Sequence, residues 1–496
     1  MNLKTVTLSI EENNHANLLT HLRIAGHVIP AYCAGKGVCG KCKVRFLENA
    51  PAWKENEARF FTKEELEDGW RLACETKVTG TVRLEILDIR VKKKEAEEKK
   101  ELGTSNVPKK AEYVAAVDIG TTTVAVSKIE KTTKTVINTL TGINDQKVFG
   151  ADVISRIHEA NHGKGMMLQL LVKNTLKRMY QKLGMSVDTT KSVISCNTTM
   201  GHLLQGYSCK NLGVAPYKPV DLSLHQFKNM TILPGISAFA GADMVSGIVA
   251  TGMDQSEKIS IFVDIGTNGE MAIGNKDRIL VASVAAGPAF EGGNIIHGMA
   301  GIPGAISAVE IVKKADGAYD NVLEVIGDET PAGLCGSGVL DTVYELRKNN
   351  LIDETGLLAE EYFETGYPLG GKIFFTAKDV REVQLAKAAL RAGIDVLMKE
   401  YEVTGEQIDS LYLAGGFAYY MNVKKAVGIG LLPKELEKKV QIVGNTSLAG
   451  AEFFAMEDGP ESKIREQFVH AVSIAEEIVL ADNEMFQKLY VDKMNF

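Results

Sequence analysis

Four cysteines are the residues of this chain best placed to do redox chemistry. Cys33, Cys39 and Cys42 share one short glycine-rich stretch, and Cys74 follows at a distance. Plant-type iron–sulfur proteins use C-x4-C-x2-C plus a distant fourth cysteine, and here the first gap is five residues. A disulfide pair and a zinc knuckle are the alternative interpretations, although structural zinc usually needs two C-x2-C hooks and only one is present. The spacing therefore favours an iron–sulfur cluster held by these four thiolates.

A repeated turn is the second feature of the sequence that could take part in chemistry. Asp118-Ile-Gly-Thr121 and Asp264-Ile-Gly-Thr267 lie 146 residues apart, and each separates two hydrophobic strand patterns. Such a hairpin tip exposes backbone N–H groups that can hold a phosphate. An aspartate at a strand end suits Mg²⁺, which takes few carboxylates and keeps most of its waters. One copy would be a weak signal, but two copies at domain-length separation predict a two-part phosphate site.

Three further stretches and one aspartate could complete a nucleotide site. Residues 410–417 read as a strand that runs into Gly415-Gly416, where a flat ligand could lie against the backbone. Asp243 either positions a water near a γ-phosphate or caps a helix, and capping is the commoner role for this residue type. The glycine-rich stretches 285–293 and 334–338 either line the cleft or are packing turns before helices.

The remaining cysteines and histidines show no ligand spacing. We expect Cys196, Cys209 and Cys335 to be buried, inert thiols. We expect His202 and His297 to be core or surface residues rather than metal ligands. Asn197 or Thr198 is expected to cap a helix.

Composition restricts the class of protein. The chain has 496 residues, 45% hydrophobic and 24% charged, as in ordinary globular proteins, and its length predicts three or more domains. Residues 113–496 hold 36 Lys and Arg against 46 Asp and Glu, opposite in sign to a nucleic-acid binder. No apolar run approaches the ~20 residues of a membrane span, and no signal-peptide pattern is present. An odd count of seven cysteines argues against a disulfide framework, so we expect a cytoplasmic protein without membrane or nucleic-acid partners.

The order of patterns predicts a multidomain α/β chain. Residues 1–87 read as a small β-rich domain, 88–112 as a charged linker, 113–258 as a first lobe with one phosphate turn, and 259–496 as a second lobe with the other. Within the first domain, alternating apolar residues predict strands at 6–10, 43–47 and 81–87, and a short helix near 18–22.

The first domain resembles the β-grasp fold of [2Fe–2S] ferredoxins, and the five-residue first gap resembles the adrenodoxin-like branch. The resemblance implies a [2Fe–2S] cluster on Cys33, Cys39, Cys42 and Cys74.

The two lobes resemble the ASKHA superfamily of actin, Hsp70 and sugar kinases, with its phosphate-1, phosphate-2 and adenosine motifs in the same order. The resemblance implies ATP and Mg²⁺ in a cleft between two closing lobes, with Asp118, Asp264 and Asp243 as catalytic candidates. The residues expected to bind the nucleotide are Gly120, Thr121, Thr122, Thr123, Gly266, Thr267, Asn268, Gly269, Gly336, Ser337, Gly338, Gly415, Gly416 and Phe417.

The whole chain resembles the reductive activators of corrinoid proteins, including the stretches that begin at Asn197, Pro234 and Gly241. Membership would imply ATP-dependent transfer of one electron to Co(II), which restores Co(I) for a methyltransferase system. It would also imply a corrinoid protein and an upstream low-potential electron donor as partners, and it is compatible with a homodimer. The alternatives are an ATP-driven electron donor to another low-potential enzyme, such as a radical dehydratase, and a nucleotide-gated redox sensor without turnover.

Overall fold

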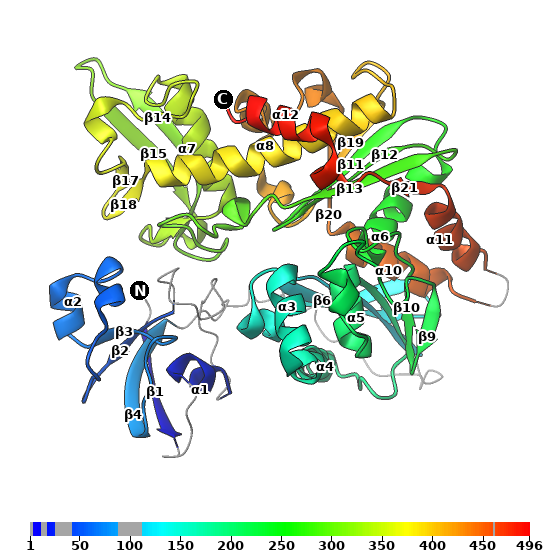
Figure 1. Cartoon of the computed structure of the whole chain (residues 1–496), viewed down its shortest axis with the longest axis horizontal. Helices are drawn as coiled ribbons and strands as arrows, with labels where there is room; N and C mark the ends of the chain where they lie inside the picture. The colour runs from blue at the N-terminus through cyan, green and yellow to red at the C-terminus, as the bar shows by residue number, and fades with distance from the viewer. Residues whose placement is uncertain (1–2, 11–16, 25–41, 88–111, 460–461) are drawn as a thin grey trace, which may run out of the picture. The chain divides into compact units, whose positions relative to one another are not determined.

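The computed structural model describes residues 3–10, 17–24, 42–87, 112–459 and 462–496. The chain divides into two compact units (Figure 1). One unit comprises residues 1–108 and 145–159, and the other comprises 109–144 and 160–496.

The described part of residues 1–87, here called the head, is built on a small sheet with strand order β1-β4-β2-β3. Its core contains Leu18, Leu22, Val44 and Leu84, all fully buried. The alternating and helical patterns expected from the sequence are confirmed here. The elements are β1 Leu3–Ile10, α1 Leu18–Ile24, β2 Lys43–Phe46, a 3₁₀ turn Glu55–Arg59, α2 Lys63–Glu67, β3 Trp70–Leu72 and β4 Gly80–Leu87. In the same unit lie a 3₁₀ turn Asp145–Phe149 and α3 Val153–Glu159.

The first lobe of the larger unit has a six-stranded sheet in the order β7-β6-β5-β8-β10-β9. Strands β5, β6 and β7 form an antiparallel meander, and β8 and β10 add parallel strands beside β5. The strands are β5 Tyr113–Ile119, β6 Thr123–Glu130, β7 Thr135–Ile143, β8 Ser192–Cys196, β9 His225–Phe227 and β10 Met230–Ile232. Its helices are α4 Gly165–Lys182, α5 Thr198–Gln205 and α6 Ala242–Thr251.

The second lobe repeats this arrangement. Its sheet runs β20-β19-β11-β12-β13-β21, with an antiparallel meander of β11, β12 and β13 and with β19 and β20 parallel beside β11. The strands are β11 Ser260–Ile265, β12 Gly269–Gly274, β13 Ile279–Val284, β19 Ser410–Ala414, β20 Val440–Gly444 and β21 Ala475–Glu477. The matching strand orders confirm the two-lobed ASKHA fold expected from the paired turns.

Helices α6 and α10 (Thr446–Glu457) join the two lobes through one shared core. A Cβ on Gly247 of α6 would lie 2.4 Å from the ring of Phe262 on β11, so only glycine allows this approach. A Cβ on Gly450 of α10 would lie 2.5 Å from the Cβ of Ser246 on α6. Helix α10 follows the second-lobe strand β20 but packs on β5, β8 and α6 of the first lobe. The C-terminal half of the chain thus supplies part of the first lobe.

Most of the remaining elements extend the second lobe. Helix α8 lies along β12 and β13 and carries α12 on it (Figure 1). Among the described residues, no helix has both the length and the apolar character needed to cross a membrane. The elements that extend the second lobe are β14 Ala305–Lys313, β15 Tyr319–Val325, β16 Gly333–Leu334, α7 Gly336–Lys348, β17 Tyr367–Gly370, β18 Ile373–Phe375, α8 Ala377–Glu400, α9 Val423–Gly428 and α12 Glu484–Asp492. Helix α11 Ile464–Ser473 packs instead on α6 and α10.

Candidate functional site

Two of the four expected cluster ligands lie together in the head. β2 and β3 pair antiparallel with Lys43 opposite Leu72, and the Ala73 N–H donates to the Cys42 carbonyl at 2.9 Å. This hairpin brings the Sγ atoms of Cys42 and Cys74 to 3.3 Å from each other, and both side chains are buried. In a tetrahedral thiolate site with metal–sulfur bonds of about 2.3 Å, two ligand sulfurs stand about 3.8 Å apart. The pair therefore fits one metal ion after a small adjustment.

The other two expected ligands, Cys33 and Cys39, lie outside the described residues, as do residues 88–111 of the expected linker 88–112. The assignment of these two thiols to a cluster stays a prediction from their spacing.

Asp118 is the penultimate residue of β5, and two hydrogen bonds fix its side chain. Its Oδ2 accepts a hydrogen bond from Asn445 Nδ2 at 2.8 Å, and its Oδ1 accepts one from Ser447 Oγ at 2.7 Å. Both donors come from the start of α10. Burial raises the pKa of the Asp118 carboxyl, and these two hydrogen bonds oppose that shift.

A chain of buried hydroxyl groups extends this anchorage. Ser195 Oγ on β8 lies 2.9 Å from Ser447 Oγ and 2.9 Å from Ser246 Oγ on α6. Because the Asp118 carboxylate can only accept, the Ser447 hydroxyl donates its hydrogen to it. The Ser447 oxygen is then free to accept a hydrogen bond from the Ser195 hydroxyl. The first phosphate turn is thus fixed to α6, β8 and α10 together.

Asp264 is the penultimate residue of β11, the corresponding position in the second lobe. A Cβ on Gly415, at φ +96°, would lie 2.7 Å from Asp264 Oδ1 and 2.5 Å from the Ile265 carbonyl oxygen. Glycine is therefore required where the expected adenosine turn passes the aspartate. A Cβ on the neighbouring Gly416 would meet no atom within 4 Å, so the backbone there borders open space.

Four carboxyl groups influence one another around these two strand ends. Burial, then Asp243 and Asp118, raises the pKa of Asp264 to about 7. Burial is also the main cause that raises the pKa of Asp243 to about 6. Glu270 lies directly across the ladder from Asp264, and burial, then Asp243 and Asp264, raises its pKa well above the usual value. The sequence-predicted Asp118, Asp243 and Asp264 are thus brought together, and Glu270 joins them.

Asp243 lies in the first turn of α6. The N-cap of α6 is Gly241, and Asp243 Oδ1 accepts from the Met244 N–H at 2.9 Å. A Cβ on Gly241 would lie 2.6 Å from the Thr198 nitrogen, so the start of α6 abuts the start of α5. Asp243 is thus not the N-cap residue itself, but its carboxylate accepts hydrogen bonds from N–H groups of the first turn, as a helix-capping role requires. Its expected role in positioning a water stays a prediction.

The first turn is braced by two asparagines. The Gly120 N–H donates to the Thr123 carbonyl at 2.9 Å, and Asn144 donates through its backbone to Thr122 and through Nδ2 to Gly120. Asn197 caps α5, as expected, by accepting from the Met200 N–H, and its Nδ2 donates to Thr121 Oγ1 at 3.1 Å.

The second turn contacts the stretch 285–293. The Gly266 N–H donates to the Asn268 carbonyl at 3.0 Å, and Thr267 Oγ1 donates to Glu291 Oε2 at 2.8 Å. The Asn268 side chain hydrogen-bonds Glu270. Gly269 serves packing, since a Cβ there would lie 2.2 Å from Leu390 on α8.

The Gly336-Ser337-Gly338 turn packs tightly at the start of α7. A Cβ on Gly336 would lie 1.8 Å from the Phe290 carbonyl oxygen, and one on Gly338 would lie 2.2 Å from that of Ile306. Ser337 Oγ donates to the Ser307 carbonyl at 2.7 Å. These observations favour the packing interpretation of this turn.

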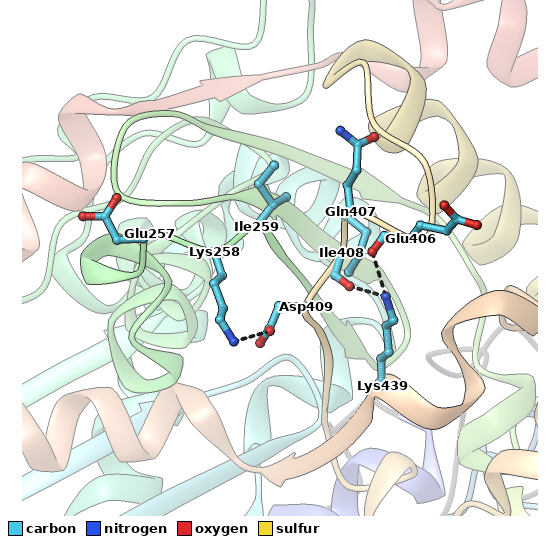
Figure 2. A pocket seen from close by; sticks show the side chains of 8 residues that line it. All are labelled: Glu257, Lys258, Ile259, Glu406, Gln407, Ile408, Asp409 and Lys439. Atoms are coloured by element: carbon cyan, nitrogen blue, oxygen red, sulfur yellow. Dashed lines mark hydrogen bonds and ion pairs between the residues drawn. The ribbon is translucent and has the colours of Figure 1, made fainter.

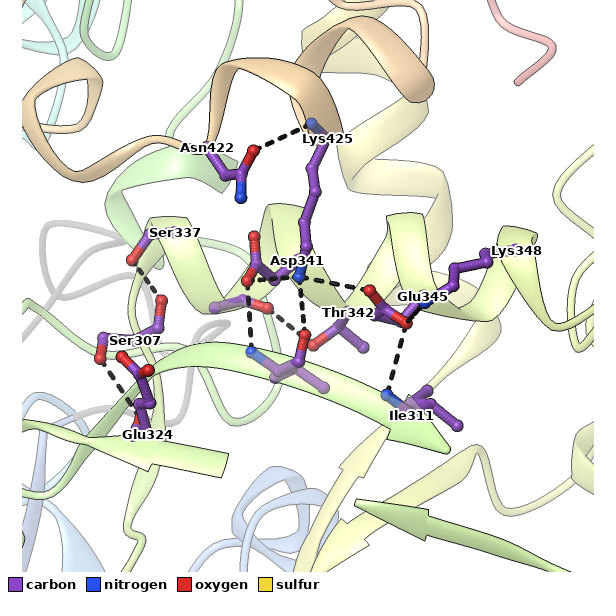
Figure 3. Close-up of polar contacts among 12 residues, drawn as sticks. Ser307, Ile311, Glu324, Ser337, Asp341, Thr342, Glu345, Lys348, Asn422 and Lys425 are labelled. Atoms are coloured by element: carbon purple, nitrogen blue, oxygen red, sulfur yellow. Dashed lines mark hydrogen bonds and ion pairs between the residues drawn. The ribbon is translucent and has the colours of Figure 1, made fainter. Parts of the chain in front are cut away.

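Phe417 is buried and stacks on Phe290, with ring centroids 4.7 Å apart. Behind it, Lys425 on α9 joins the adenosine region to α7. Figure 3 shows its Nζ reaching Asp341 Oδ2 at 2.8 Å and Glu345 Oε1 at 3.3 Å. Burial raises the pKa of Asp341, and Lys425 opposes this shift. Removing the lysine would leave two buried carboxyl groups without their shared counter-charge.

A hollow of about 440 Å³ lies at the starts of β11 and β19, whereas Asp264 is near the far end of β11. Figure 2 shows the side chains that line this hollow. Lys258 Nζ pairs with Asp409 at 2.6 Å, and Lys439 Nζ donates to three backbone carbonyls. Because these cations already have partners within the fold, the hollow is a structural feature rather than the nucleotide site.

Sequence reasoning missed Asn445, Ser447 and Glu270. Asn445 also accepts from the Leu448 N–H, so its sequence signal was that of an ordinary helix cap. Glu270 could have been found from the hairpin register, which places it opposite Asp264. No three His, Cys, Asp or Glu side chains of the described part of the chain lie close enough to form a metal site by themselves, and neither His202 nor His297 belongs to such a group. Cys196, Cys209 and Cys335 are buried, as expected.

Three family profiles match the chain. Residues 1–79 match a 2Fe-2S iron-sulfur cluster binding domain, residues 113–256 match the "RACo middle region", and residues 258–496 match the "C-terminal domain of RACo the ASKHA domain".

Individual relatives agree with these profiles. The chain is 33% identical to the corrinoid activation enzyme RamQ of Eubacterium limosum, over 78% of this chain and 71% of the relative. It is 27% identical to the [Co(II) methylated amine-specific corrinoid protein] reductase of Methanosarcina barkeri, over 77% of each chain. A solved structure titled reductive activator for corrinoid,iron-sulfur protein superposes with a TM-score of 0.69 at 26% identity, and covers 99% of this chain and 96% of its own.

Proposed function

The chain belongs to the RACo family of reductive activators of corrinoid proteins, and from this membership we propose that it reduces the cobalt of a corrinoid protein from Co(II) to Co(I) with the help of ATP. One electron leaves the protein for each cobalt that is reduced. When bound, the [2Fe–2S] cluster supplies that electron and Mg·ATP supplies the free energy of hydrolysis.

In the head, Cys42 and Cys74 would hold one iron, and Cys33 and Cys39 would hold the other. The N–H of Leu19 donates to the Ala73 carbonyl, and Asn17 Nδ2 donates to the Cys74 carbonyl at 3.1 Å. These hydrogen bonds fix the backbone on both sides of Cys74, so the two described thiolates keep their separation during a change of charge.

In the lobes, the amides of the two turns would bind phosphate groups, and Gly415-Gly416 would border the adenosine. Asp264 is our candidate ligand for Mg²⁺, directly or through a water. Mg²⁺ usually takes one or two carboxylates plus phosphates and waters, which suits a group of buried carboxyls that forms no ready-made cage. Asp118 and Asp243 would orient the attacking water.

The observation that best supports an ATP-driven step is a direct link between the expected adenosine and phosphate-1 regions. The Gly415 N–H donates to the Gly444 carbonyl at 3.1 Å, and the next residue, Asn445, donates to Asp118. A nucleotide that moves the Gly415 turn therefore also moves the donors that hold Asp118. This gives lobe closure a mechanical route across the cleft.

The proposal includes a separate low-potential electron donor, because each activation consumes one electron that the head must regain. A cytoplasmic location suits thiolate ligands, which a reducing compartment keeps from forming disulfides.

The experiment is activation of a Co(II) corrinoid protein from the same organism, followed by the Co(I) absorbance and by phosphate release. Wild type is expected to form Co(I) only with both reductant and Mg·ATP. Cys42→Ser should lose the cluster absorbance and Co(I) formation while nucleotide binding persists. Cys209→Ser, a buried thiol of the first lobe, is the matched control and should retain both. Wild type that hydrolyses ATP without forming Co(I) would contradict the proposal.

The alternative that keeps the same cofactors is electron donation to a different low-potential enzyme. It predicts that such an enzyme, and not the corrinoid protein, stimulates phosphate release.

A further inference from the structure

Helix α4 turns one face to the first lobe and the opposite face to solvent. The helix packs against α5, β6 and β7 (Figure 1). On its outer face Met166, Met167 and Leu170 are 84%, 50% and 51% exposed. Three large apolar side chains within two turns form a patch of the kind that marks protein–protein contacts. The buried residues of α4 are Leu168, Val172, Thr175, Leu176, Met179 and Tyr180.

The same outer face continues as a cationic surface. Met166, Leu170, Lys173 and Lys177 are spaced so that they share one side of the helix over about 16 Å. Burial, and then the charge of Lys228 in the β9–β10 turn, lowers the pKa of Lys173, so cations crowd at this point. We call Met166, Met167, Leu170, Lys173 and Lys177 the α4 face.

Charge on the α4 face contrasts with the rest of the body. Residues 113–496 as a whole carry about ten more acidic than basic residues, whereas the stretch 160–184 has no Asp or Glu. Its basic residues are Lys164, Lys173, Lys177, Arg178 and Lys182.

We infer that the α4 face docks the corrinoid protein through an acidic surface with an apolar centre. This inference rests on the proposed function. The lysines of the α4 face would pair with carboxylates on the corrinoid protein, and the methionines would pack against an apolar area from which water is excluded. The head of the same chain is a poorer complement, because residues 1–87 hold 12 basic and 11 acidic residues. An electron donor needs to contact only the head, whereas the corrinoid protein must also respond to the ATP-binding lobes. A docking surface on the first lobe therefore suits the corrinoid protein better than the donor.

The structure connects the α4 face to the first phosphate turn. Gln169 Nε2 on α4 donates to the Leu204 carbonyl on α5 at 3.0 Å. At the other end of α5, Asn197 donates to Thr121 Oγ1 in the turn. A nucleotide that shifts this turn therefore acts on α5 and, through it, on α4. The corrinoid protein should accordingly bind the nucleotide-loaded and nucleotide-free forms with different affinities.

The test uses the full chain with its cluster and the Co(II) form of a corrinoid protein from the same organism. Its Kd is measured by calorimetry with and without Mg·ATP at two salt concentrations. Lys173→Glu/Lys177→Glu should weaken binding at least 10-fold and flatten its salt dependence, because like charges would face each other. Met166→Ser/Leu170→Ser should weaken binding without changing the salt dependence.

The matched control is Lys434→Glu/Lys438→Glu, which changes the net charge equally at two exposed second-lobe lysines of the same spacing. It should bind like wild type. Cluster absorbance, nucleotide affinity and the thermal midpoint should be unchanged in all variants, which separates docking from folding.

Unchanged affinity in both α4 variants, with wild type binding normally, would overturn the inference and leave the proposed function standing. Slower reduction of the cluster by its donor, with normal corrinoid affinity, would also overturn it and assign the face to the donor. Wild type that neither binds nor activates the corrinoid protein would instead refute the proposed function.

Discussion

The two lobes use the same sheet to place an aspartate, but they surround it differently. Asp118 lies opposite Ala125 on β6 and Ser195 on β8, and two donors from α10 hold its carboxylate. Asp264 lies opposite Glu270 on β12 and Ala414 on β19, among carboxyl groups that raise its pKa.

The difference suggests a division of labour between equivalent positions. A carboxylate satisfied by neutral donors is already positioned before any ligand arrives, so Asp118 is suited to orient a water. A carboxyl group crowded by other acids is stabilised by an arriving cation, so Asp264 is suited to bind Mg²⁺. The same fold thus produces one preorganised and one ligand-dependent aspartate.

Replacing each aspartate by asparagine is the test of this contrast with the largest expected effect. Both Asp118→Asn and Asp264→Asn should reduce Mg·ATP-dependent Co(I) formation about 10²- to 10³-fold. Their stabilities should diverge. Asp118→Asn leaves one buried donor without an acceptor, which costs about 1–3 kcal/mol, whereas Asp264→Asn removes a crowded buried acid.

Urea unfolding of the nucleotide-free protein checks the divergence. The midpoint should fall for Asp118→Asn and hold or rise for Asp264→Asn. Equal losses of stability in the two variants would contradict the assigned roles, and the visible cluster absorbance should stay constant in both.

Gly415→Ala should have the next largest effect. The new Cβ would meet Asp264 Oδ1 at 2.7 Å at a backbone φ of +96°, so it both strains the turn and displaces the aspartate. Nucleotide affinity, measured by calorimetry, should fall about 10- to 100-fold. Gly444→Ala is the control, because its φ is +71° but its Cβ meets no atom within 4 Å. Similar affinity losses in both variants would show that backbone strain alone is responsible.

The smallest expected effect is a pH dependence that belongs to the second lobe. Because the pKa of Asp264 is raised to about 7, a proton competes with Mg²⁺ below that pH, and Mg·ATP affinity should fall up to about 10-fold per unit as pH decreases from 7. Asp243→Asn removes the strongest charge that raises this pKa, so its affinity curve should shift to lower pH.

The folding stability of the nucleotide-free form depends on pH in the opposite direction to the Mg·ATP affinity. Between the unfolded pKa near 3.8 and the folded value near 7, the folded protein binds more protons than the unfolded chain, so this group's contribution declines as pH rises through that window. An affinity curve that is flat from pH 6 to 8 would exclude Asp264 as the group that meets the cation.

The motifs were predictable because each is local. The Asp118 and Asp264 hairpins, the strand before Gly415 and the helix capped by Asn197 depend on residues within a few positions of one another. The strand alternation around Cys42 and Cys74 is equally local. The family resemblance added the cofactors and the partner.

What the sequence could not show depends on long-range packing. Asn445 has the signature of a helix cap, and only the crossover of α10 brings it to Asp118, 327 positions earlier. Asp243 has the sequence signature of a first-turn helix acid, and only long-range packing brings it near Asp118. The placement of Cys33 and Cys39 and the domain boundaries stay predictions.

The crossover of α10 also has a consequence during protein synthesis. The first-lobe sheet and α6 are complete by residue 258, yet the helix that covers them ends at residue 457, which is 199 residues later. At about 5–20 residues per second, the ribosome needs roughly 10–40 s to supply it. Throughout that interval, the surface of α6 around Ser246, which Gly450 of α10 later covers, is exposed on the nascent chain. The unfinished first lobe is therefore a natural client for chaperones.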